Sequence, residues 1–247
     1  MPSPAPLGVQ LFSVREALAA DLPGTLTALA EIGYAGIEPY RGVPDHKQAA
    51  ALAKELGMQV PSGHMPLPID ENEKSALETA ALYGLERLIL PWLPQEDFTD
   101  KDTINRGAQV AAANGLKLAY HNHDAEFTRT DDWYPYQVML EHLDPSVAFQ
   151  VDTYWVQVGG PDPAAVLTEL GDRAPSIHIK DGPAQKGVAQ LALGSGVIDI
   201  PAIIKASQGH ADWVIVELDD CDTDMLAALR ESYTYMTQEG LGRGRAG

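Results

Sequence analysis

Short apolar stretches alternate along this chain with longer segments in which apolar residues recur at helical spacing. The short stretches predict eight strands, at residues 9–12, 36–39, 59–63, 87–90, 117–121, 147–152, 176–180 and 213–217. The helical pattern predicts one helix after each strand, over residues 23–32, 45–56, 72–83, 100–114, 135–143, 163–170, 201–208 and 222–236. Several of these helices end at a glycine, at Gly33, Gly57, Gly84 and Gly115, as is common at helix C-termini.

Eight strands that are each followed by a helix predict a single α/β domain, folded as a (β/α)8 TIM barrel. We place this domain at residues 1–239. Residues 240–247 alternate glycine with arginine and offer little to bury, so we expect a flexible tail there. A doubly wound open sheet is the alternative fold, but no GxGxxG motif follows the first predicted strand.

The charge of the chain excludes several classes of partner. Its 17 Lys and Arg against 35 Asp and Glu give a formal charge of -18, which repels nucleic acid and anionic lipid. No signal sequence and no membrane-spanning segment is expected, since apolar runs are short. The single cysteine, Cys221, excludes an internal disulfide and favours the cytoplasm. Composition leaves open whether the chain is a monomer or a homo-oligomer.

Polar side chains gather where the predicted strands end. In chain order these are Gln10, Glu38, His64, Trp92, His121, His123, Asp152, His178, Lys180 and Glu217. The C-terminal ends of barrel strands meet at one mouth, so we expect these groups to line one pocket.

Two carboxylates of this set follow strongly apolar strands. Asp152 in FQVDTYW and Glu217 in WVIVELDD would lose hydration at a strand end, so a cation or several donors must compensate them. His121 and His178 end neighbouring strands. Imidazole and carboxylate together suit Mn²⁺, Co²⁺, Zn²⁺ or Fe²⁺, whereas Mg²⁺ prefers more oxygen. These residues therefore predict a divalent metal site, and a strand-end cap is the alternative for Asp152.

The candidates for binding a substrate are His64 in PSGHMPL, Glu38 in GIEPY and the aromatic residues Trp92 and Trp155. Each has a structural alternative: a turn cap for His64, a salt bridge for Glu38, and core or lid packing for the tryptophans. Glu126 is a further candidate for binding a substrate. The acidic residues that follow the last predicted strand, from Asp219 onward, are expected to form a solvated loop.

Six phrases occur in order along nearly the whole chain: GVQLFSVRE, SGH, YHNHDAEF, VDTYW, IHIKDG and LGSGVIDIPAII. Together they resemble the xylose isomerase-like TIM-barrel superfamily, and within it the sugar phosphate isomerase/epimerase group. The resemblance implies one divalent ion, with Mn²⁺ expected first, held by His121, Asp152, His178 and Glu217. The family commonly has glutamate where His121 stands, so either this imidazole is the first ligand or Glu126 takes its place.

The same resemblance implies a metal-dependent isomerase or epimerase of a sugar, sugar phosphate or keto-polyol. Such an enzyme abstracts a proton next to a carbonyl and passes through an enediolate. Glu217 is the expected first base, and His121, His123 or Glu126 the second. Lys180 is expected to stabilise the enolate oxygen. The partner is then a small polyhydroxylated carbonyl compound.

Other activities use the same groups. A dehydratase or lyase, of the inosose dehydratase or keto-sugar type, needs only one base and one acid for β-elimination. A non-catalytic sugar-binding barrel is a further class. Apurinic-site endonucleases share the barrel, but they are expected to have a larger metal cluster with additional histidines. The acidity of this chain also argues against DNA as a substrate.

Overall fold

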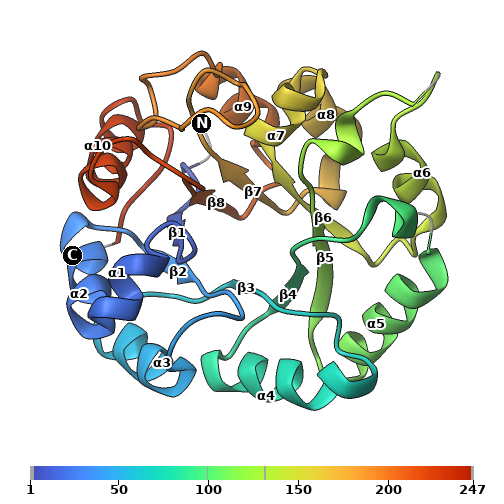
Figure 1. Cartoon of the computed structure of the whole chain (residues 1–247), viewed down its shortest axis with the longest axis horizontal. Coiled ribbons are helices and arrows are strands. Elements are labelled where there is room, and N and C mark those ends of the chain that lie inside the picture. Colours follow the sequence, from blue (N-terminus) through green and yellow to red (C-terminus); the bar gives the residue numbers. More distant parts are fainter. Residues whose placement is uncertain (1–2, 99, 131, 246–247) are drawn as a thin grey trace.

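The computed structural model describes residues 3–98, 100–130 and 132–245. Within them, eight parallel strands curve into a barrel that the helices surround (Figure 1). The strands are β1 (Leu7–Gln10), β2 (Gly36–Glu38), β3 (Ser62–His64), β4 (Arg87–Leu90), β5 (Lys117–His121), β6 (Ala148–Asp152), β7 (Ser176–Ile179) and β8 (Trp213–Val216). The predicted (β/α)8 barrel is confirmed.

The barrel closes between β2 and β3, which stand at the two ends of the hydrogen-bonded strand order β2-β1-β8-β7-β6-β5-β4-β3. Isolated parallel bridges join them, between Gly36 and Gln59 and between Tyr40 and His64. We predicted the third strand at residues 59–63, whereas its regular part begins at Ser62. Pro61 explains the shift, because proline has no backbone N–H to donate to a neighbouring strand.

Ten α-helices lie in the described part of the chain. They are α1 (Arg15–Ala20), α2 (Leu22–Ile32), α3 (His46–Glu55), α4 (Glu73–Tyr83), α5 (Lys101–Ala113), α6 (Pro135–His142), α7 (Thr153–Gly159), α8 (Pro163–Leu170), α9 (Ile200–Ser207) and α10 (Met225–Gln238). The short helices α1 and α7 were not predicted. The residues of α7, TYWVQVG, are mostly β-branched or aromatic and are typical of a strand.

The sheet register places polar residues side by side at the C-terminal ends of the strands. Gln10 lies opposite Glu38 on β1 and β2, and Asp152 lies opposite His178 on β6 and β7. Apolar side chains on the helices, such as Leu26 and Leu29 of α2, are buried in the surrounding core. The polar groups therefore sit on a rigid apolar scaffold.

Residues 240–245, which we expected to belong to a flexible tail, lie against the N-terminal end of the barrel. The backbone N–H of Leu7 donates to Arg243 O at 2.9 Å, and Arg243 N–H donates to Ala5 O at 3.0 Å. Arg245 N–H donates to Gly33 O at 2.9 Å. Residues 246–247 lie outside the described part. Among the described residues, no helix is long and apolar enough to cross a membrane.

Candidate active site

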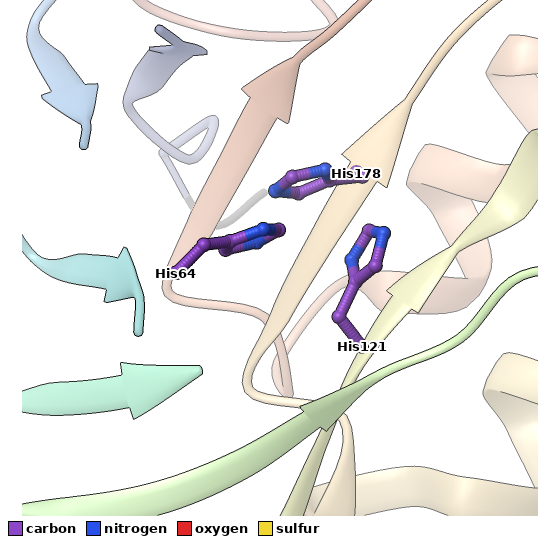
Figure 2. A group of neighbouring side chains, drawn as sticks. All are labelled: His64, His121 and His178. Carbon is purple, nitrogen blue, oxygen red and sulfur yellow. The ribbon is translucent and has the colours of Figure 1, made fainter. Parts of the chain in front are cut away.

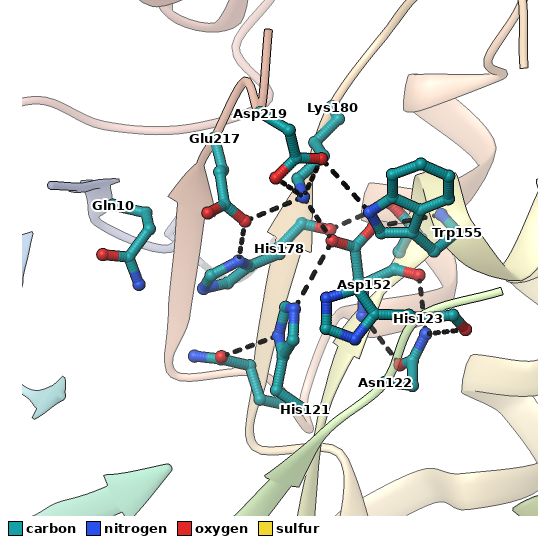
Figure 3. A network of polar contacts seen from close by, with 12 residues as sticks. Gln10, His121, Asn122, His123, Asp152, Trp155, His178, Lys180, Glu217 and Asp219 are labelled. Carbon is teal, nitrogen blue, oxygen red and sulfur yellow. Dashed lines mark hydrogen bonds and ion pairs between the residues drawn. The ribbon is translucent and has the colours of Figure 1, made fainter. Parts of the chain in front are cut away.

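Four potential metal ligands converge inside the C-terminal mouth of the barrel. His121, Asp152, His178 and Glu217 are all buried, and one ligand atom from each lies within 4.8 Å of the others. They come from β5, β6, β7 and the end of β8 (Figure 3). The structure thus brings together the same four residues that the sequence led us to expect.

Asn122 sets the position of Asp152 across the β5–β6 pair. Its Oδ1 accepts the backbone N–H of Asp152 at 2.9 Å, and its Nδ2 donates to Asp152 O at 3.2 Å. Asp152 Oδ1 accepts the N–H of Trp155 at 3.1 Å and so caps α7. The other oxygen, Oδ2, lies 3.7 Å from His121 Nε2. One carboxyl oxygen therefore orients the residue while the other faces the ligand group.

Three imidazoles face one another within the barrel, from His64, His121 and His178 (Figure 2). The His64 ring stacks on the His178 ring with centroids 5.2 Å apart and an interplanar angle of 8°. The His121 ring meets His178 nearly edge-on, with centroids 4.6 Å apart. His64 was expected to bind substrate. It lies beside the metal-ligand candidates and also lines the cavity described below.

Glu38 lies beneath these rings with no exposed surface. Its Oε2 contacts His178 Nε2 at 2.6 Å and His64 Nε2 at 3.2 Å, and it accepts Gln10 Nε2 at 2.8 Å. Its Oε1 accepts Gln150 Nε2 at 2.8 Å and the Ser62 hydroxyl. Glu38 was expected to bind substrate. Here its partners are protein side chains, so its direct effect is on the position of the histidines.

Lys180 lies on the other side of the ligand group and is also buried. Its Nζ lies 2.8 Å from Asp152 Oδ2 and 2.9 Å from Glu217 Oε2. It also contacts both oxygens of Asp219, at 3.0 and 2.8 Å. One ammonium group therefore contacts three carboxylates.

The residue after Lys180 fixes the loop that follows β7. Asp181 is buried, and its carboxylate accepts backbone N–H groups from Gly182, Gly194, Gly196 and Ile198 at 2.8 to 3.2 Å. A Cβ at position 196 would lie 2.1 Å from Asp181 Oδ1, so only glycine allows this approach. The LGSGVID phrase is thereby tied to the end of β7, next to Lys180.

The two histidines among the candidate ligands differ in charge. Burial would lower the pKa of His178, but Glu217 and Glu38 raise it to about 10. Burial lowers the pKa of His121 well below 6.5, and the neighbouring His178 and His64 lower it further. His121 is thus neutral at pH 7 and has a lone pair available to a metal ion.

The carboxylates differ as well. Burial raises the pKa of Asp152 above its usual value, and Lys180 opposes this rise only in part. Burial would also raise the pKa of Glu217, but Lys180 and His178 hold it well below 4.5. Glu217 is therefore ionised, whereas Asp152 carries a desolvation cost that further positive charge would offset.

A cavity of about 210 Å³ opens onto this group from the mouth of the barrel. Its walls are Phe12, Tyr40, Arg41, His64, Pro91, Trp92, His121, His123, Glu217 and Asp219. Trp92, an expected substrate contact, is 58% exposed and forms part of the rim. Two larger hollows lie at the N-terminal ends of the strands, and a third, of about 320 Å³, lies between α1 and the loop that contains Cys221. None of the three is lined by the histidines and carboxylates of the site, so the smaller cavity is the one that gives access to them.

His123, Glu126 and Trp155 lie around one side of the site. His123 lines the cavity, and its buried Nδ1 has no hydrogen-bond partner within the described structure. Glu126 accepts the Tyr120 hydroxyl and the N–H of His123, the latter at 3.0 Å. Trp155 Nε1 donates to Asp219 Oδ2 at 3.2 Å. The cavity walls do not include Glu126 or Trp155.

Sequence reasoning missed Gln150, misplaced Asp219, and did not name the cavity walls Phe12, Tyr40 and Arg41. Gln150 Oε1 contacts His121 Nδ1 at 3.1 Å and His64 Nε2 at 2.8 Å. It stands two residues before Asp152, hence on the same strand face, and this spacing could have indicated it. Asp219 was expected in a solvated loop, but it binds Lys180 because the end of β8 turns it toward β7.

The donor set fits a divalent ion. It offers two imidazoles and two carboxylates. His121 is neutral and free to coordinate, whereas His178 must lose a proton and its contact with Glu217 or Glu38 before it can bind an ion. Mixed nitrogen and oxygen ligands suit Mn²⁺, Fe²⁺, Co²⁺ and Zn²⁺. A ligand spread of up to 4.8 Å is close to the separation of opposite ligands around one ion, about 4 Å for bonds of about 2 Å.

Comparisons with known proteins agree with this fold. A family model described as xylose isomerase-like TIM barrel matches residues 26–238. An inosose dehydratase of Geobacillus kaustophilus (strain HTA426) is 26% identical over 163 residues, which cover 58% of this chain and 51% of that protein. This chain thus spans about half the length of the curated relatives it matches.

Two solved structures share the fold. A sugar phosphate isomerase/epimerase from Parabacteroides distasonis ATCC 8503 superposes with a TM-score of 0.81 at 23% identity, covering 97% of this chain and 100% of that one. The IolI protein with a bound zinc atom gives a TM-score of 0.72 at 14% identity, covering 96% of this chain and 98% of that one. At these identities the likeness establishes the fold.

Proposed function

The chain belongs to the xylose isomerase-like TIM barrel family, and from this premise we propose that it is a metal-dependent isomerase or epimerase. Its substrate is a small polyhydroxylated carbonyl compound, such as a sugar, sugar phosphate or keto-polyol. One observation carries the proposal: His121, Asp152, His178 and Glu217 converge within 4.8 Å at the mouth of the barrel. The IolI protein, which has the same fold, binds a zinc atom, and this supports a metal ion in this chain as well. We propose Mn²⁺ as the ion and the cytoplasm as the site of action.

The proposed reaction begins with proton abstraction beside the carbonyl. A bound divalent ion supplies Lewis acidity that makes this C–H more acidic. Glu217 removes the proton, because it is ionised and lines the cavity. Its Oε2 already contacts His178 and Lys180, so we assign proton transfer to Oε1. Isomerisation and epimerisation share this step.

Two further groups complete the proposed mechanism. Lys180 stabilises the negative charge that develops on the enolate oxygen. His123, whose ring lines the cavity, takes up a proton from solvent and returns it to the enediolate. Burial and Lys180 lower its pKa, which makes the protonated ring a ready donor. His64 and Trp92 contact the substrate from the cavity wall. Glu38, first expected to bind substrate, instead orients His64 and His178 in this scheme.

The experiment is solvent exchange. Protein purified without chelators is analysed for metal, loaded with Mn²⁺ and incubated with a panel of keto-sugars in deuterated water. We expect deuterium at the carbon beside the carbonyl, and none with the control variant Glu217→Gln. Lack of exchange with every substrate, together with unchanged ligand affinity in Glu217→Gln, would instead indicate a sugar-binding barrel.

A dehydratase or lyase is the second candidate, favoured by the similarity to inosose dehydratases. The same base would remove the proton, and His123 would then donate a proton to the leaving hydroxyl in a β-elimination. This reaction yields an unsaturated ketone. Ultraviolet absorbance that grows with time during incubation with keto-inositols and keto-sugars would identify it.

A further inference from the structure

Lys180 contacts one oxygen of each carboxylate in the proposed ligand group. Its Nζ lies 2.8 Å from Asp152 Oδ2, the oxygen that faces His121 Nε2. It lies 2.9 Å from Glu217 Oε2, the oxygen that contacts His178 Nδ1. The ammonium group therefore interacts with the same side of both carboxylates that the histidines face.

A divalent ion held by these carboxylates would share them with a positive charge a few ångströms away. Two cations that bind the same carboxylate oxygens repel each other, and this repulsion is strong in a buried site. We infer that Lys180 is a built-in competitor of the metal ion for Asp152 and Glu217, and that Asp219 retains its ammonium group when the ion binds. The inference rests on the proposed metal site.

Asp219 is suited to this role because other groups hold it. Its Oδ2 accepts Trp155 Nε1 at 3.2 Å and Gln190 Nε2 at 2.9 Å. Its backbone N–H donates to Gln190 Oε1 at 2.7 Å, and its carbonyl accepts Arg15 Nη1 at 3.0 Å. The ammonium of Lys180 thus has a third, separately anchored carboxylate when it releases the other two.

The local charges are consistent with this exchange. Three carboxylates contact the one ammonium of Lys180, so its single positive charge cannot compensate all three. In the absence of the ion, Lys180 limits the repulsion between Asp152 and Glu217. With the ion bound, its charge opposes binding, so this lysine makes the metal easier to release.

The test measures the affinity of the full chain for Mn²⁺ by calorimetry. Lys180→Met and Lys180→Gln remove the charge, and we expect them to lower the Kd roughly tenfold to a hundredfold. Lys180→Arg keeps the charge and is expected to bind no more tightly than the wild type. The matched control is Lys186→Met in the loop after β7, since Lys186 is exposed and pairs with Asp124. Its Kd should stay within about twofold of the wild type.

Asp219→Asn tests the retaining role. Without the carboxylate of residue 219, Lys180 pairs only with Asp152 and Glu217. Mn²⁺ should therefore bind less tightly than in the wild type. Asp219→Asn should have little effect in a Lys180→Met background, because the competing charge is then absent. If both neutral Lys180 variants fail to fold, the Asp219→Asn single variant still tests the inference. An unchanged Kd in that variant overturns it.

The outcomes separate this inference from the proposed function. If the wild type binds Mn²⁺ and the neutral Lys180 variants bind it no better, competition is refuted while the metal site stands. If only the neutral variants bind the ion, Lys180 dominates in the wild type and the inference is supported. If neither the wild type nor any variant binds Mn²⁺, Co²⁺ or Zn²⁺, the metal site fails and the inference fails with it.

Discussion

Two polar layers lie inside this barrel, buried except for Asp219, and they are built differently. The lower layer consists of Glu38 and its partners Gln10, Ser62, His64, Gln150 and His178. The upper layer consists of Lys180 and the three carboxylates that it contacts, Asp152, Glu217 and Asp219.

In the lower layer, neutral and cationic donors from five residues surround one carboxylate, so its charge is compensated by protein alone. In the upper layer one ammonium contacts three carboxylates, of which only Glu217 has a second cationic partner, His178, and two of the three border the cavity. A fully compensated layer holds its shape, whereas an under-compensated layer attracts a further cation. The contrast predicts that substitutions in the lower layer reduce stability, whereas substitutions in the upper layer reduce metal affinity.

The largest expected effect comes from Asp152→Asn in the upper layer. Asparagine can still cap α7, but it removes an anionic ligand, so Mn²⁺ affinity should fall more than about a hundredfold and solvent exchange should be lost. Burial raises the pKa of Asp152, which means that its charge disfavours the metal-free fold. The melting temperature of the metal-free variant should therefore equal or exceed that of the wild type. A clear drop would place Asp152 in the same class as the lower layer.

Glu38→Gln in the lower layer should have the opposite balance. It removes one partner of a buried ion pair with His178, so the free energy of unfolding of metal-free protein should fall by about 3 kcal/mol. Mn²⁺ affinity should fall only about tenfold, because the change acts through the orientation of His178. Urea unfolding and calorimetry on the same samples give both values. Equal stability with a lost metal site would contradict the division into layers.

The smallest effect concerns Glu126, a buried carboxylate outside both layers. Burial raises its pKa above 4.5, opposed in part by the hydrogen bond from Tyr120. Below pH 4.5 the residue is protonated in both the folded and the unfolded chain. As pH rises, the unfolded chain loses this proton first, so the wild type loses stability through the window between 4.5 and the raised pKa.

Glu126→Gln lacks this titration. The free energy of unfolding of this variant should therefore rise relative to that of the wild type between pH 4.5 and pH 7, which means that the variant becomes the more stable of the two. Urea unfolding at both pH values measures the difference, and Glu141→Gln on the exposed side of α6 is the control. A difference that stays constant with pH would mean that burial does not govern Glu126.

The strand and helix pattern was predictable because it depends on local periodicity. β4 and β5 lie where we predicted them, at 87–90 and 117–121, since each is a short apolar run after a helix-ending glycine. The helix α7 was not predictable in this way. Its residues favour a strand, and it forms because Asp152 caps it where β6 ends.

The sequence by itself determined the (β/α)8 barrel and the residues at the strand ends, because side-chain alternation and helix caps are local properties. It could not distinguish the environments of Glu38 and Glu217, which both follow apolar strands. Barrel closure decided that Glu38 would be enclosed by donors from β1, β3, β6 and β7, whereas Glu217 borders a cavity. It also brought Asp219 to Lys180 across β7 and β8. These differences depend on distances between strands that are remote in sequence, and only the folded chain sets those distances.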